Sequence, residues 1–86
     1  MSDQIFSRIG VRYEVALDVL GAIIAHYSEV IGLERSKPVP DETVIAAAQK
    51  ASNEIEDIRD DLDPNAGDFI EQVIAQYGPL ARQLYQ

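Results

Sequence analysis

Residues 13–33 are the most apolar part of this chain, and their pattern limits what it can fold into. On a helical wheel at about 100° per residue, their apolar side chains fill an arc of roughly 220°, whereas a surface helix needs little more than about 100°. These side chains are Tyr13, Val15, Ala16, Leu17, Val19, Leu20, Ala22, Ile23, Ile24, Tyr27, Val30, Ile31 and Leu33. So wide an arc must be covered on several sides. The sequence therefore predicts a central helix with more than one neighbour.

The chain has 86 residues, which predicts one domain spanning residues 1–86. A chain of this size buries only about 60–65% of its unfolded surface, so association with another chain would add stability. Its 15 acidic and 7 basic residues give a net charge of −8. This balance argues against direct binding to nucleic acid, which needs a basic stripe, and is compatible with a basic protein partner.

The pattern also predicts that no segment spans a membrane. The longest uninterrupted apolar run is 19–25, between Asp18 and His26, and a span needs about 20 apolar residues. Asp3, Glu14 and Asp18 lie where a signal peptide would have basic and then apolar residues. There is no cysteine, so no disulfide framework or thiolate chemistry is available. We expect a cytoplasmic protein.

The first helix is predicted to start at about Gln4 or Gly10 and to end at about Arg35. Residues 9–19 also alternate between apolar and other side chains, as a short strand would. A helix is favoured because the 3.6-residue period continues beyond this segment and a single strand would have no partner. The segment 36–40 ends the helix, since residues before proline are pushed out of the α region.

The second helix is predicted to begin near Pro40, with Asp41 and Glu42 at the positive end of its dipole. Its apolar residues follow 4-3-4-3-4 spacing, the narrow seam typical of a coiled-coil-like helix. They are Val44, Ala48, Ala51, Ile55, Ile58 and Leu62. A turn at residues 63–67 follows.

The third helix is predicted to open at Asp68, with Asp68 and Glu71 forming a capping box. Its apolar residues form one arc of roughly 160°, and this phase continues past Gly78-Pro79. A helix kinked at Gly78-Pro79 is therefore favoured over a break. The predicted fold class is all-α: a small three-helix bundle with the first helix central, in a dimer.

Acidic residues gather at the end of the second predicted helix, where the negative end of the dipole disfavours them. The proposed partner-binding residues are Glu54, Asp57, Asp60, Asp61 and Asp63. Two interpretations remain open: a solvated face, or a docking strip for a basic protein. The frame and final ligand of a calcium-binding loop are wrong here, because Ala66 and Gln72 replace the required glycine and glutamate.

Two further features have a structural and a functional interpretation. His26 is the only histidine, so it cannot build a zinc site without cysteine, and a packed structural histidine is favoured over a catalytic base. Gly10, Gly21 and Gly32 are eleven residues apart and share one helix face. They are either a chance spacing or a groove where another helix backbone comes close.

These observations predict a small, acidic, non-catalytic protein-interaction module: a helical dimer, an adaptor, an inhibitor or an antitoxin-like partner. No catalytic residue, metal site or cofactor is expected. The expected oligomer interface contains Tyr13, Leu20, Ile23, Tyr27 and Val30. Two alternatives stay open: an enzyme with a site between subunits, for which Arg8/Arg12 and Arg35/Lys37 are the paired basic residues, or an acidic mimic of nucleic acid.

Overall fold

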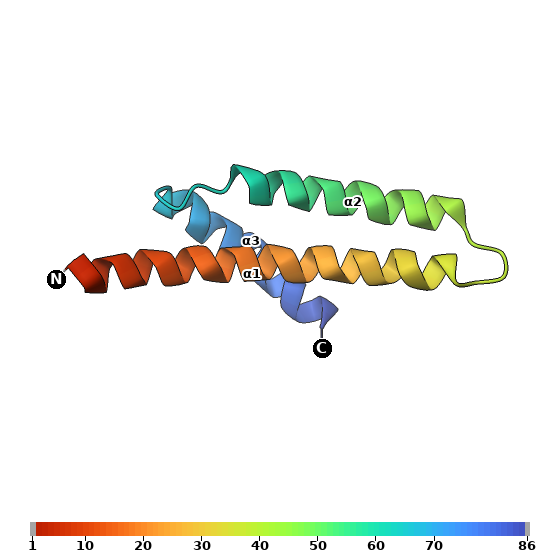
Figure 1. The fold of residues 1–86 in the computed structure, drawn as a ribbon, viewed down its shortest axis with the longest axis horizontal. Coiled ribbons are helices and arrows are strands. Elements are labelled where there is room, and N and C mark those ends of the chain that lie inside the picture. The colour runs from red at the N-terminus through yellow and green to blue at the C-terminus, as the bar shows by residue number, and fades with distance from the viewer. Residues whose placement is uncertain (1, 86) are drawn as a thin grey trace.

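The computed structural model consists of three helices joined by two short connections (Figure 1). It describes the backbone of residues 2–85 and the side chains of residues 10–85. Helix α1 spans Ser2–Arg35, α2 spans Glu42–Asp61 and α3 spans Gly67–Leu84. The helices α2 and α3 both pack on α1, which confirms the predicted all-α bundle with a central first helix.

Helix α1 is continuous from Ser2, earlier than either predicted start, and residues 9–19 are helical. The strand that their alternation allowed is absent because a lone strand cannot pair its backbone groups, whereas a helix satisfies them internally. The predicted end at Arg35 is confirmed. There, the backbone N–H and side-chain hydroxyl of Ser36 donate hydrogen bonds to the last turn of the helix.

Helix α2 begins at Glu42, two residues later than predicted. Asp41 is the N-cap rather than part of the first turn, because its side chain accepts a hydrogen bond of 2.9 Å from the backbone N–H of Thr43. That bond satisfies one of the four free N–H groups that every helix start presents. Glu42 lies in the first turn, as the dipole argument predicted.

Helix α3 starts at Gly67, and the predicted capping box is wrong. Ala66 is the N-cap and supplies no side-chain hydrogen bond. Glu71 is instead engaged by Arg12 of α1 at 2.7 and 2.8 Å, because a guanidinium offers a carboxylate two parallel donors. The helix runs through Pro79 without a break, as predicted.

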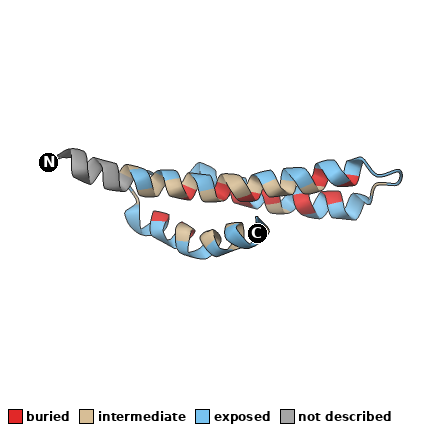
Figure 2. Ribbon diagram, turned by 90° about the horizontal axis from the view of Figure 1, so that it is seen from below, coloured by how far each residue is buried: buried red, intermediate tan, exposed pale blue. Residues whose placement is uncertain are grey.

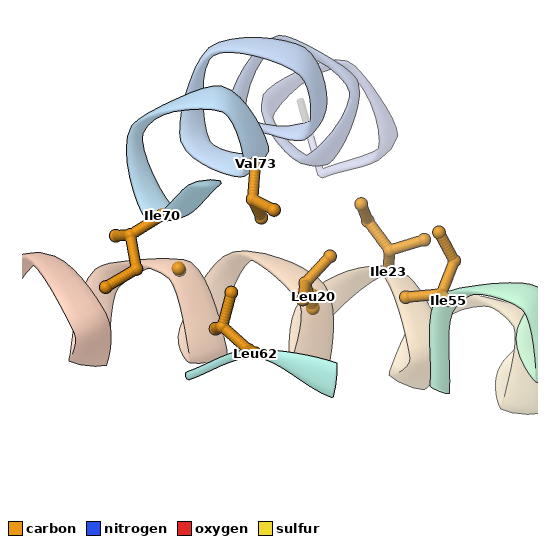
Figure 3. Close-up of a cluster of buried hydrophobic side chains, with 7 residues drawn as sticks. Leu20, Ile23, Ile55, Leu62, Ile70 and Val73 are labelled. Carbon is orange, nitrogen blue, oxygen red and sulfur yellow. The ribbon is translucent and has the colours of Figure 1, made fainter. Parts of the chain in front are cut away.

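One apolar core lies where all three helices meet (Figure 3). Its buried residues are Ala16, Leu20, Ile23, Ile55, Leu62, Ile70 and Val73. Leu20 and Ile23 of α1 have no exposed surface at all, and Ile70 of α3 is 1% exposed. Complete burial of a leucine or isoleucine side chain stabilises a fold by about 1.5–3 kcal/mol, so this core holds the bundle together.

A second, smaller cluster lies nearer the α1–α2 connection and involves two helices only. It contains Ile31 of α1 with Ile45 and Ala48 of α2, flanked by Tyr27 and Val30. Figure 2 shows that α3 forms a second layer beneath only part of the α1–α2 pair. The molecule therefore has a three-helix half and a two-helix half, and the second is called here the hairpin half (residues 27–51).

The predicted seam of α2 is partly wrong. Ala48, Ile55 and Leu62 are buried as expected, whereas Val44 is 37% exposed and Ile45 and Ser52 are buried in its place. Residues near the start of α2 belong to the smaller cluster with α1 alone, whereas Ile55 and Leu62 near its end belong to the core cluster that also contains residues of α3. The spacing of apolar residues in the sequence does not show this change of surroundings along α2.

Helix α1 is also long and apolar enough between Gly10 and Arg35 to cross a membrane, by length and composition alone. The sequence argument from the longest uninterrupted run did not anticipate this, because the wider window tolerates isolated charges. The core helix of a water-soluble bundle meets the same criteria. Only 17% of the most apolar window is buried within the chain.

Candidate functional site

The acidic residues proposed to bind a partner all lie on the surface. Glu54, Asp57, Asp60 and Asp61 are exposed on the last turns of α2, and Asp63 is exposed in the following turn. Asp63 also accepts a hydrogen bond of 2.8 Å from the backbone N–H of Asn65, which shapes that turn. Arg59, the one basic residue of this helix end, is exposed as well. The segment is thus a strongly negative helix end that is open to solvent.

The five residues expected at an oligomer interface are placed differently from one another. Leu20 and Ile23 lie inside the chain's own core and have no exposed surface to offer a second copy. Tyr13, Tyr27 and Val30 are half-buried at the edges of the two clusters. The helical period placed all five residues on the apolar arc of this helix, but it could not show which of them are buried by the chain's own helices.

An apolar groove of about 520 Å³ runs along the outer side of the α1–α3 contact. Val15, Val19 and Ala22 line it from α1, and Ile74 and Ala81 line it from α3. Tyr85 closes one end, where its hydroxyl donates a hydrogen bond of 2.9 Å to the carbonyl oxygen of Ala22. Asp18 and Arg82 also line the groove, so its mostly apolar lining includes one acidic and one basic side chain.

A second apolar surface lies on the hairpin half, on the side that α3 occupies farther along the pair. Helix α3 begins beside the end of α2 and diverges from α2 as it crosses α1 (Figure 1). We call the surface left open the hairpin face, formed by Tyr27, Val30, Val44, Ala47 and Ala51. Val44 and Ala47 are exposed, and the other three are half-buried.

Glu34 fixes the connection between α1 and α2, a role that the sequence analysis missed. Its side chain is almost fully buried and accepts hydrogen bonds of 3.0 Å from the backbone N–H of Asp41 and from Lys37 Nζ. These two bonds, the backbone one first, lower the pKa of Glu34 because they favour the carboxylate. The spacing of Glu34 and Lys37 was the available signal, but the bond across the connection depends on tertiary structure.

An ion pair and an aromatic contact connect α3 with α1. The Arg12–Glu71 pair lies near the start of α3, and its hydrogen bonds lower the pKa of Glu71. At the other end, the His26 ring lies 5.5 Å from the Tyr27 ring and 6.3 Å from the Tyr85 ring, both in edge-to-face geometry. His26 thus has the packed structural setting that the sequence favoured.

The three spaced glycines make no close approach within the chain. A β-carbon added at Gly10, Gly21 or Gly32 would have no other atom within 4 Å. The groove interpretation is therefore wrong for the chain's own helices, because none of their backbones packs against this face. The face stays open to solvent.

Metal-ligating and paired basic side chains are the remaining candidates for a site in the described part of the chain. Among residues 10–85, no three histidine, cysteine, aspartate or glutamate side chains gather where they could hold a metal ion. Of the paired basic residues that an inter-subunit enzyme site would use, Arg12 is engaged by Glu71 and Lys37 by Glu34.

Comparison with known proteins gives no match: no family model, no curated protein and no solved structure matches this chain.

Proposed function

We propose that this chain is a non-catalytic protein-interaction module that acts as a homodimer. The observation that carries this proposal is surface area. The single chain exposes 6017 Å², about 1,000 Å² more than a compact monomer of its mass would expose. A standard protein–protein interface covers about 800 Å² on each partner, so the surplus is of the size that one partner would cover.

The shape of the chain supports the same conclusion. Its radius of gyration is 15.6 Å, whereas a compact domain of this length has about 12 Å. The long axis measures 59 Å against 24 and 17 Å for the other two. In an elongated chain whose most apolar helix is only partly buried, apolar surface is available for binding another protein.

The acidic end of α2 is the proposed docking surface for a basic protein partner. Glu54, Asp57, Asp60, Asp61 and Asp63 are exposed together, and the helix dipole disfavours acids at this position. Folding alone therefore gives no reason for the cluster. Negative charge gathered at one end would speed the encounter with a basic surface.

The test of this docking surface is an Asp57→Asn/Asp60→Asn/Asp61→Asn triple variant. A variant with Glu14→Gln, Asp18→Asn and Glu29→Gln is the matched control, because it removes the same charge from exposed positions on α1. The probe is a lysine- and arginine-rich peptide, and the measurement is its association rate at low and high salt. We expect the first variant alone to bind more slowly at low salt, with a flatter salt dependence. Equal rates for the two variants would remove this surface from consideration.

We also propose that the protein is cytoplasmic and that α1 functions in water. Glu14, Asp18 and Glu29 would lie within the apolar layer if residues 10–35 crossed a membrane, at a cost of about 2.5–3.5 kcal/mol for an acidic residue near its centre. Fractionation of cells that produce the full chain tests this proposal. Recovery in the membrane fraction would overturn it.

A bend in α3 at Gly78-Pro79 belongs to the same proposal. Pro79 has no N–H to donate to the carbonyl oxygen of Ala75, so one hydrogen bond of the helix is missing. Such a bend would let the last turns of α3 follow the surface of α1 toward the Tyr85–Ala22 hydrogen bond. Pro79→Ala should straighten the helix, and a crystal structure of that variant with an unchanged α3 axis would exclude the bend.

A further inference from the structure

We propose that the hairpin face is the surface through which the chain self-associates, and that it binds the same face of a second copy. This inference rests on the proposed function, since it locates the interface of the dimer proposed there. The hairpin face consists of Tyr27, Val30, Val44, Ala47 and Ala51, as defined above.

The lengths of the helices leave this face uncovered. At about 1.5 Å per residue, the 34 residues of α1 extend about 50 Å and the 18 residues of α3 about 27 Å. Helix α3 is fastened to α1 between Arg12, which binds Glu71, and Ala22, which accepts from Tyr85. Beyond the Tyr85 and His26 rings, the end of α3 reaches α1, among the described residues, only through Leu84 and Tyr85, which line an open pocket with Val30 and Leu33, and the buried cluster there is formed by α1 and α2 alone.

One row of apolar side chains on α2 starts in the hairpin half and continues to the core cluster shared by the three helices. Val44, Ala51 and Ile58 are seven residues apart and therefore lie on nearly the same helix face. Ile58 packs against the core cluster to which Ile70 and Val73 of α3 belong. Val44 and Ala51 are on the same row where no third helix is present, and Val44 is 37% exposed. A third layer is thus present at one end of the row and missing at the other.

The distribution of charge along the chain favours a second copy of this chain as the partner that binds the hairpin face. The hairpin half, residues 27–51, carries four acidic and three basic residues, a net charge of −1. The remaining segments, 1–26 and 52–86, carry eleven acidic and four basic residues, a net charge of −7. Two copies that meet through the hairpin face keep their acidic ends at the outer ends of the dimer. A dimer through the three-helix half would bring those charges together, which repulsion disfavours.

Symmetry and area agree with this arrangement. In a two-fold dimer the same patch faces itself, so a self-complementary apolar patch flanked by nearly balanced charge suits it. Covering the hairpin face on both copies places a four-helix layer around Ile31, Ile45 and Ala48, which the single chain leaves between two helices. The surplus of about 1,000 Å² belongs to the whole elongated chain, and the hairpin face is the part of it that this arrangement would cover.

Two neighbouring alanines provide a matched test. Ala46 and Ala47 are both exposed on α2, but they point about 100° apart, and Ala47 alone lies on the hairpin face. Ala47→Glu and Ala46→Glu add the same charge to helix positions of equal propensity. We expect sedimentation to show a dimer for the wild type and for Ala46→Glu. Ala47→Glu should weaken the dimer about tenfold or more, because it places two carboxylates in one interface.

Crosslinking adds a measurement that does not depend on destabilising the dimer. The chain has no cysteine, so Ala47→Cys and Ala46→Cys each introduce a single thiol. A short bis-maleimide should join two copies of Ala47→Cys and leave Ala46→Cys largely uncrosslinked. Circular dichroism of each variant checks that the helices are intact.

The outcomes separate this inference from the proposed function. A wild type that stays monomeric at high micromolar concentration overturns both. A wild-type dimer that Ala47→Glu and Val44→Glu leave intact overturns the hairpin face and keeps the homodimer. In that case, dissociation by Val19→Glu would place the interface in the groove between α1 and α3 instead.

Discussion

The two halves of this molecule use the same central helix in different ways. In the three-helix half, α1 is covered from two directions, and Ala16, Leu20 and Ile23 have no exposed surface. In the hairpin half, α1 has one helical neighbour, and its best-buried apolar residue, Ile31, is still 9% exposed. The apolar character of α1 hardly changes between the halves, but the cover available to it does. The apolar side chains of the hairpin half are therefore only partly covered within the single chain.

This difference between the halves concerns both the stability of the folded chain and its binding to a partner. The fully buried residues Leu20, Ile23 and Ile70 lie where α3 is present, whereas exposed apolar side chains occur in both halves, among them Val44 in the hairpin half and Tyr85 at the end of α3. A helix as long as α1 cannot be covered by an α3 of about half its length.

The largest expected difference between the halves concerns their cores. Leu20→Ala should lower the free energy of unfolding by about 3–5 kcal/mol, because it leaves a cavity in a fully enclosed site. Ile31→Ala should cost about 2 kcal/mol at low protein concentration, since its site can collapse or admit water. Urea unfolding followed by circular dichroism measures both. Equal costs at low concentration would remove the distinction between the halves.

Glycine substitutions compare the open faces of the halves. Gly21 lies in the three-helix half and Gly32 in the hairpin half, and an added β-carbon meets no atom within 4 Å at either position. Gly21→Ala and Gly32→Ala should each stabilise the protein by about 0.5–1 kcal/mol through helix propensity. Thermal unfolding measures the effect. A destabilising alanine at either position would show that another backbone approaches this face.

A smaller effect is expected where α3 ends and the hairpin half begins. Tyr85→Phe removes the hydrogen bond to the carbonyl oxygen of Ala22 and should cost about 0.5–1 kcal/mol. Tyr77→Phe, half-buried on the same helix, is the matched control. Hydrogen exchange should show faster opening of the last turns of α3 in Tyr85→Phe alone. Unchanged exchange would mean that apolar packing holds this end.

The pH dependence of the α1–α2 connection is the subtlest test. Hydrogen bonds from the Asp41 N–H and Lys37 lower the pKa of Glu34, so the folded state favours its carboxylate. This stabilisation is fully present above the ordinary glutamate pKa of about 4.3. It is lost as the pH falls below that value and through the lowered pKa of folded Glu34. Glu34→Gln should therefore lower Tm at neutral pH, and its difference from the wild type should shrink as the pH falls below the ordinary glutamate range.

Glu29→Gln, an exposed change of the same kind on α1, is the control for that experiment. If the Tm difference between Glu34→Gln and the wild type stayed constant from neutral to acid pH, the buried carboxylate would not be what holds the connection.

Local chemistry made much of this fold predictable. Proline at positions 38 and 40 and at 64 marks both connections, and the 3.6-residue period identifies all three helices. The wide apolar arc of residues 13–33 gave α1 its central place. The candidate surface at the end of α2 could be named from charge alone, because acidic residues at a helix end seldom become buried.

Other features were out of reach of sequence reasoning. The capping box predicted at Asp68 is absent because the carboxylate of Glu71 accepts hydrogen bonds from Arg12, which is 59 residues away in sequence. Val44 belongs to the apolar seam by spacing, yet it is exposed because the third layer ends before reaching it. Period and propensity describe one helix at a time, whereas these outcomes depend on which helices meet.

The sequence by itself determined where the helices lie and which of them is central, since both follow from local backbone preferences and from the width of an apolar face. Only the tertiary structure decided which apolar residues are covered. Leu20 and Tyr27 are seven residues apart on nearly the same face of α1, but Leu20 is fully buried where all three helices meet and Tyr27 is only half-buried. Burial is a property of neighbours in space, so the direction and length of α3 fixed which part of α1 is closed and which stays open.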